Sequence, residues 1–167
     1  MKTEPAQEIQ SLIAVRFSLD KPTALQNISL MGCCEEHDDW YKAYRTITWL
    51  EFGEILLQPE QGGLDATDFI GIRPIAYYYF APGILWAVTE SILRYQEIAY
   101  HLWDWLRDLH GTKSRQPTYH HELAEQFNQA QKELVAKCLE LANTIHLETE
   151  GYRDRHIDWS LSSVWVT

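Results

Sequence analysis

The sequence predicts an all-α protein, a helical bundle of three long helices with one or two shorter elements. Three stretches carry apolar residues at spacings of three and four, the repeat of an amphipathic helix. No internal repeat, low-complexity tract or domain linker interrupts them. The chain has 167 residues, of which 46% are hydrophobic, enough for one packed core. We therefore expect residues 1–167 to form a single helical-bundle domain.

The N-terminal half is expected to hold two helices. Residues 4–18 fit both a helical and a strand-like apolar pattern, and we favour the helix. A second helix is expected from Glu35 to Leu57, followed by a loop over residues 58–74. The first turn of the second helix is acidic, which complements the helix dipole, and it contains Glu35, Glu36, Asp38 and Asp39.

The central element is expected to be one continuous helix from Ile84 to Leu109. Pro82 and Gly83 precede it as a start signal, and Gly111 follows it as a stop signal. Apolar residues cover most of its circumference, so it should be buried among other helices. One narrow seam is ionisable, and we interpret it either as a solvated stripe or as a semi-buried network lining a cleft. The seam consists of Glu90, Arg94, Glu97, His101, Asp104 and Asp108.

The last long helix is expected to begin at Thr118 and to be interrupted at Gly151. The final residues, SLSSVWVT, are apolar and β-prone. We expect a short extended tail there. It would pack on the body, pair with another extended segment or dock on a partner.

The charge balance favours a protein partner over nucleic acid. The chain has 24 acidic and 14 basic residues, a net charge of −10. An acidic surface repels phosphate backbones and attracts basic proteins, although the same excess also serves solubility. Exposed tyrosine and tryptophan often anchor interfaces, so we expect binding through aromatic and acidic side chains. The candidates are Tyr77, Tyr78, Tyr79, Trp105, Trp159, Trp165, Glu35, Glu36, Asp38 and Asp39. A second copy of the same chain, in a homodimer, is an alternative partner.

The cysteines indicate a reducing compartment. Cys33, Cys34 and Cys138 are odd in number and two are adjacent, which is not a disulfide framework or a zinc pattern. The N-terminus lacks the apolar region of a signal peptide, and no uncharged run is long enough to cross a bilayer. We predict a cytoplasmic protein without a membrane span and without a cofactor.

The segment Tyr152-Arg153-Asp154-Arg155-His156-Ile157 follows the last long helix. It resembles the signature of HEPN-type domains, all-helical bundles of which many cleave RNA as toxins or defence proteins. The resemblance implies that Arg153 is the signature arginine and Asp154 its polar neighbour. The signature histidine should follow after four to six residues, but His156 comes too early. Arg115 and His120 meet the spacing, but they precede their helix and span a proline.

An RNA-cleaving site needs a base for the 2′-hydroxyl and a cation for the phosphate. Arg153 could supply the cation, whereas the base is missing, so the resemblance favours an inactive or repurposed relative. The alternative interpretation of this segment is a capped helix end with surface ion pairs.

His101 and Asp104 share a helix face and form a second candidate site. With Glu97 they could act as an acid–base pair or bind a metal, with Glu51 or Glu54 adding carboxylates. The Glu-x-x-His repeat of metal-binding bundles is absent, so a structural polar seam is the alternative.

These observations favour a non-enzymatic, acidic interaction module, such as an inhibitor, immunity factor or regulatory subunit of a bacterial defence or toxin system. The alternatives are a HEPN-like RNase or an inactive relative, and a metal-dependent helical-bundle enzyme.

Overall fold

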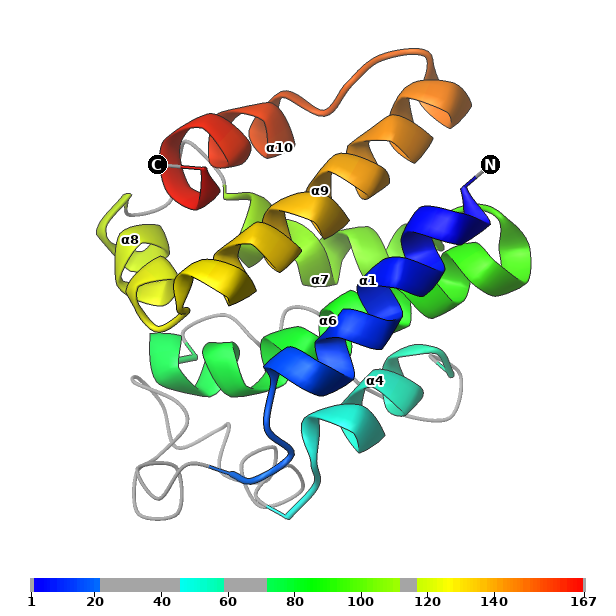
Figure 1. Cartoon of the computed structure of the whole chain (residues 1–167). Coiled ribbons are helices and arrows are strands. Elements are labelled where there is room, and N and C mark those ends of the chain that lie inside the picture. Colours follow the sequence, from blue (N-terminus) through cyan, green and yellow to red (C-terminus); the bar gives the residue numbers. More distant parts are fainter. Residues whose placement is uncertain (1, 22–45, 59–71, 112–116, 167) are drawn as a thin grey trace.

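The computed structural model describes residues 2–21, 46–58, 72–111 and 117–166, and this part of the chain is all-α (Figure 1). Its residues form seven α-helices and no β-strand. The helices are α1 (Thr3–Arg16), α4 (Trp49–Leu56), α6 (Pro74–Tyr95), α7 (Tyr100–His110), α8 (Pro117–Glu125), α9 (Gln129–Glu150) and α10 (Arg155–Ser160). A π-helical turn, η3 (Leu161–Trp165), continues α10.

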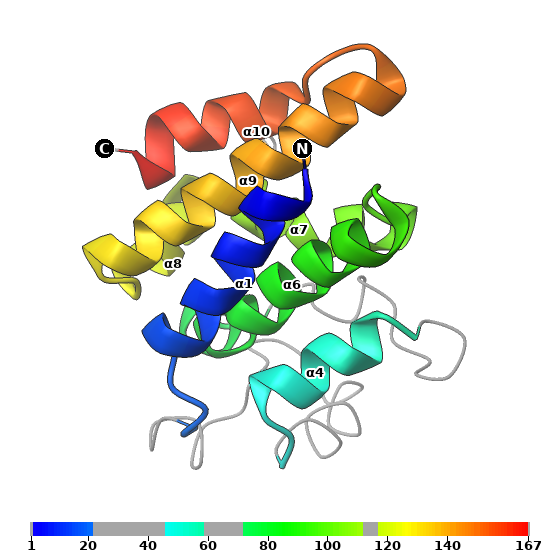
Figure 2. The same ribbon diagram turned by 45° about the vertical axis from the view of Figure 1, so that its right-hand side comes forward.

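Helix α6 is the centre of the structure. It packs against α1, α4, α7, α8 and α9, and it lies between α4 on one side and α9 on the other (Figures 1 and 2). Helix α10 and η3 cover the far side of α9 and also contact α7 and α8. Most of α6 is buried because its apolar residues surround the helix rather than forming one stripe. None of the described helices is both long and apolar enough to cross a membrane.

The expected continuous helix from Ile84 to Leu109 is wrong, because the chain breaks between α6 and α7. Gln96 adopts a left-handed conformation (φ 60°) and ends α6. The side chain of Ser91 holds the break: its hydroxyl donates to the carbonyl of Glu97 and accepts from the amide of Ala99. The ionisable seam therefore does not run along one helix, and the prediction of three long helices is not confirmed.

The expected helix start at Pro82-Gly83 is also wrong, since α6 begins at Pro74 and contains both residues. Gly83 serves a packing role instead. A Cβ at Gly83 would lie 2.2 Å from the carbonyl oxygen of Trp49, and a Cβ at Gly53 would lie 2.8 Å from the carbonyl oxygen of Gly83. The two glycines let the backbones of α4 and α6 approach closely, as small residues do at tight helix crossings.

The helix expected from Glu35 to Leu57 is wrong at its described C-terminal part, where α4 begins only at Trp49. Thr48 caps α4: its hydroxyl accepts from the amide of Glu51, and the Glu51 carboxylate accepts from the amide of Thr48. This capping box stops the helix from continuing backwards. The expected N-terminal part of that helix and the loop core at 59–71 lie outside the described residues.

The C-terminal region differs from the prediction in two places. The helix expected from Thr118 is split into α8 and α9, because Asn128 and Gln131 form a second capping box. The tail is helical rather than extended, through α10 and η3. It packs on the body: Trp165 is 2% exposed, and its indole NH donates to the Leu109 carbonyl at 2.7 Å. The expected helix over residues 4–18 and the stop at Gly151 are confirmed.

Candidate functional site

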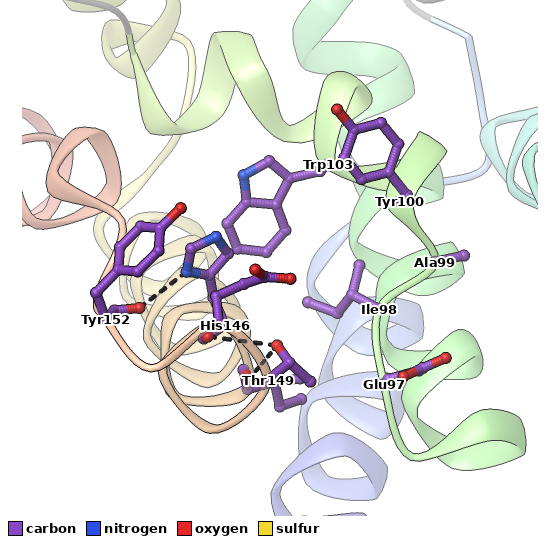
Figure 3. A pocket seen from close by; sticks show the side chains of 10 residues that line it. Glu97, Ile98, Ala99, Tyr100, Trp103, His146, Thr149 and Tyr152 are labelled. Atoms are coloured by element: carbon purple, nitrogen blue, oxygen red, sulfur yellow. Dashed lines mark hydrogen bonds between the residues drawn. The ribbon is translucent and has the colours of Figure 1, made fainter.

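A pocket of about 370 Å³ lies between the start of α7 and the end of α9, and we call it the α7–α9 pocket (Figure 3). The left-handed Gly151 ends α9 and turns the chain so that Tyr152 lies beside the last turns of the helix. The α6–α7 linker supplies the opposite wall. The lining residues are Glu97, Ile98, Ala99, Tyr100, Trp103, Ile145, His146, Thr149, Glu150 and Tyr152.

Aromatic rings dominate this pocket. His146 stacks on Trp103 with a centroid distance of 4.8 Å and an interplanar angle of 25°. The ring of Tyr152 packs edge to face against that of His146, with the two ring centroids 4.9 Å apart. Nδ1 of His146 donates to the Tyr152 carbonyl at 2.9 Å, which fixes the imidazole against the indole. Tyr100 and Tyr152 as whole residues remain 91% and 60% exposed.

A partly buried polar network adjoins the pocket at Trp103. The indole NH of Trp103 donates to the carboxylate of Asp154 at 3.2 Å. The other carboxylate oxygen accepts from the amide of His156 and caps α10. Asn143, which is fully buried, accepts from the Asp154 amide at 2.6 Å. Burial opposes ionisation of Asp154, but the hydrogen bond from the His156 amide and the other donors bring its pKa below the usual value.

His110 lies beside this network and is 4% exposed. Burial lowers its pKa to about 4, although the charge of Asp154 acts in the opposite direction. Among the described residues neither ring nitrogen of His110 has a hydrogen-bond partner, and the same holds for Nδ1 of His156. The His110 imidazole is therefore neutral at pH 7, so it neither attracts an anion nor repels a cation.

Arg153, the signature arginine of the HEPN resemblance, is committed to two carboxylates. Its guanidinium forms a bidentate pair with Glu140, with both N–O distances at 2.9 Å, and reaches Asp158 at 2.7 Å. These hydrogen bonds, first that of Glu140, raise the pKa of Arg153 above its usual value. With Asp154 as the N-cap of α10, the segment has the contacts of a capped helix end with surface ion pairs.

The structure does not assemble the predicted acid–base or metal site. Nε2 of His101 donates to the carbonyl of Leu56 at 2.9 Å, and Asp104 is exposed on α7. Glu97 lies in the linker rather than on the helix, and Glu51 is used in the capping box. In the described ranges no group of three His, Cys, Asp or Glu side chains is arranged to hold a metal ion.

Most predicted aromatic binding residues belong to the core, which corrects the expectation that they form a binding surface. Tyr77, Tyr79, Trp105 and Trp165 are all at most 4% exposed. The Tyr77 hydroxyl donates to the carbonyl of Trp105, and that of Tyr79 donates to the carbonyl of Leu19. Two further candidates, Tyr78 and Trp159, are half-buried and pack against the core. The acidic candidates Glu35, Glu36, Asp38 and Asp39 lie outside the described residues.

The aromatic residues of the α7–α9 pocket were missed as candidates. Tyr100 and Trp103 are neighbours on α7, whereas His146 lies much later in the sequence on α9, and only the fold brings the three into one pocket. Gly151 was the one useful signal, since a helix stop there places the last turn of α9 and Tyr152 together.

Comparison of the chain with protein-family models, with characterised proteins and with solved structures finds no match. No family is therefore assigned to the chain from similarity.

Proposed function

We propose that this protein is a non-enzymatic interaction module that binds a basic protein partner. The observation that carries the proposal is the net charge of −10. An excess of this size attracts a basic partner over several ångströms and speeds its association, and salt weakens the attraction.

The contacts of the ionisable groups support binding rather than catalysis. Arg153 is held by Glu140 and Asp158, and Asp154 caps a helix. Groups used in this way stabilise the fold and are not available to a substrate. In contrast, Tyr100 and Tyr152 have exposed rings, which is the usual property of aromatic anchors at an interface.

An inhibitor, an immunity factor or a regulatory subunit of a bacterial defence or toxin system would work by such binding. In each role the acidic protein covers a basic functional surface of its partner, for example a surface that binds nucleic acid.

The proposal is tested by fluorescence anisotropy with labelled decalysine and decaglutamate peptides. Decalysine should bind at an ionic strength of about 0.02 M and lose most of its affinity at about 0.5 M, where the Debye length is far shorter. Decaglutamate should not bind at either salt concentration. Absence of decalysine binding at low salt, or equal affinity at both salt concentrations, would contradict the proposal.

The HEPN-like RNase and the metal-dependent enzyme remain separate predictions. The first requires RNA cleavage without metal that is lost in Arg153→Ala. Intact RNA after incubation with concentrated protein would exclude it. The second requires a stoichiometric metal in elemental analysis of the purified protein.

A further inference from the structure

We propose that the α7–α9 pocket binds one cationic side chain, a lysine or an arginine, of the basic partner. The inference rests on the proposed function and adds the site and the group that is recognised. It starts from a cavity of about 370 Å³, which suits one long side chain but not a folded element.

The rings around this pocket are suited to a cation. Tyr100 is 91% exposed and Tyr152 is 60% exposed, and both line the cavity. In Figure 3 the rings of Trp103, His146 and Tyr152 lie on one side, and Tyr100 and Ile98 come from the other side. A lysine or arginine stem packs well on such apolar surface, while the charged head gains from an aromatic face within about 6 Å.

The charges around the pocket also favour a cationic ligand. The lining contains two carboxylates, those of Glu97 and Glu150, and no lysine or arginine. Among the described residues neither carboxylate forms an ion pair. The side chain of Glu97 points away from the rings in Figure 3, and Glu150 is the other carboxylate of the lining.

The end of α9 strengthens this field. The last carbonyl groups of a helix carry partial negative charge, which a basic residue in the last turn commonly offsets. The last turn of α9 has no basic residue and contains Glu148 and Glu150. Lys2 pairs with Glu148, whereas the pocket side, with Glu150, has no such cation within the described part of the chain. An anionic group would be repelled there, and a cationic head would be attracted.

The experiment compares decalysine affinity among four variants at low salt. Each of the three pocket variants should weaken decalysine binding by about 2- to 5-fold, the effect expected for losing one exposed cation–π or charge contact. These variants are Glu150→Gln, Tyr100→Ala and Tyr152→Ala. The control is Glu125→Gln on α8, an exposed residue that does not line the pocket and changes the net charge equally. It should alter the affinity by less than the pocket variants. Because all four substituted residues are exposed, the variants should keep the core intact, and thermal melts check that each variant is folded.

The outcomes separate the pocket from the proposed function. If wild-type protein binds decalysine with salt dependence, but Glu150→Gln and Glu125→Gln weaken it equally, the pocket inference is overturned and the proposed function stands. If wild-type protein does not bind decalysine, the proposed function fails. The pocket is then tested alone by NMR titration with Nα-acetyl-lysine methylamide. Saturable shifts at the indole NH of Trp103 that are absent with Nε-acetylated ligand support it, and unchanged spectra overturn it.

Discussion

Replacing Gly83 by alanine tests the close approach of α4 and α6. The new Cβ would lie 2.2 Å from the Trp49 carbonyl oxygen and 3.2 Å from the Gly53 amide nitrogen. Both atoms belong to the backbone of α4, so no side chain can rotate away. The helices must separate by about 1 Å, which weakens contacts across the interface by a quarter to a half.

The steric cost should lie near the upper end of the range of about 1–3 kcal/mol for overpacking. The higher helix propensity of alanine offsets about 1 kcal/mol of this steric cost. The free energy of unfolding should therefore fall by about 2 kcal/mol, and Tm by roughly 4–8 °C in a chain of this size.

Thermal melts followed by circular dichroism, with urea titrations, measure this effect. Gly151→Ala is the control, since a Cβ there meets nothing within 4 Å and only the positive φ of 82° opposes it. The control should lose about 1 kcal/mol from the left-handed backbone alone. A Gly83→Ala variant as stable as the wild type, or more stable, would refute the close crossing of α4 and α6.

Three further predictions concern the polar network. Because burial lowers the pKa of His110 from 6.5 to about 4, the unfolded state binds the proton more tightly between these values. Stability should then fall by up to about 1.4 kcal/mol per pH unit as the pH decreases from 6.5 to 4, and His110→Leu should flatten this slope in urea titrations. Asp154 has a lowered pKa, so its contribution to stability is lost only at lower pH. Equal slopes of unfolding free energy against pH in the wild type and in His110→Leu would contradict the assignment to His110. Asn143→Leu removes the acceptor of the part-buried Asp154 amide and the hydrogen bond that the Asn143 amide donates to Asp158. It should cost about 2 kcal/mol by chemical denaturation, whereas an unchanged midpoint would count against these contacts. Arg153→Ala removes the surface ion pairs with Glu140 and Asp158 and should cost about 1 kcal/mol or less, with a smaller loss at high salt. A loss independent of salt would argue against an ionic origin.

Local patterns predicted the helical class but not the ends of the helices. The apolar spacing around Ile9 and Ile13 correctly predicted α1, and Gly151 correctly predicted the end of α9. The break after Tyr95 was missed because an apolar repeat continues across it at almost unchanged spacing. The hydroxyl of Ser91, which holds the linker, gives no signal of this kind in the sequence.

The candidate binding site was harder to predict than the fold. Aromatic composition alone suggested that Tyr77 and Trp165 could face a partner, but both are buried and donate hydrogen bonds to backbone carbonyls. A buried tyrosine or tryptophan needs such an acceptor, and only the packed chain determines whether one is within reach.

The amino-acid sequence by itself determined the all-α class and the negative charge, because helical periodicity and the count of ionisable groups are local properties. Only the tertiary structure decided which aromatic rings remain exposed and that Tyr100, Trp103, His146 and Tyr152 share one pocket. The physical reason is that burial and contact depend on the path of the whole chain, and here that path depends on the break between α6 and α7.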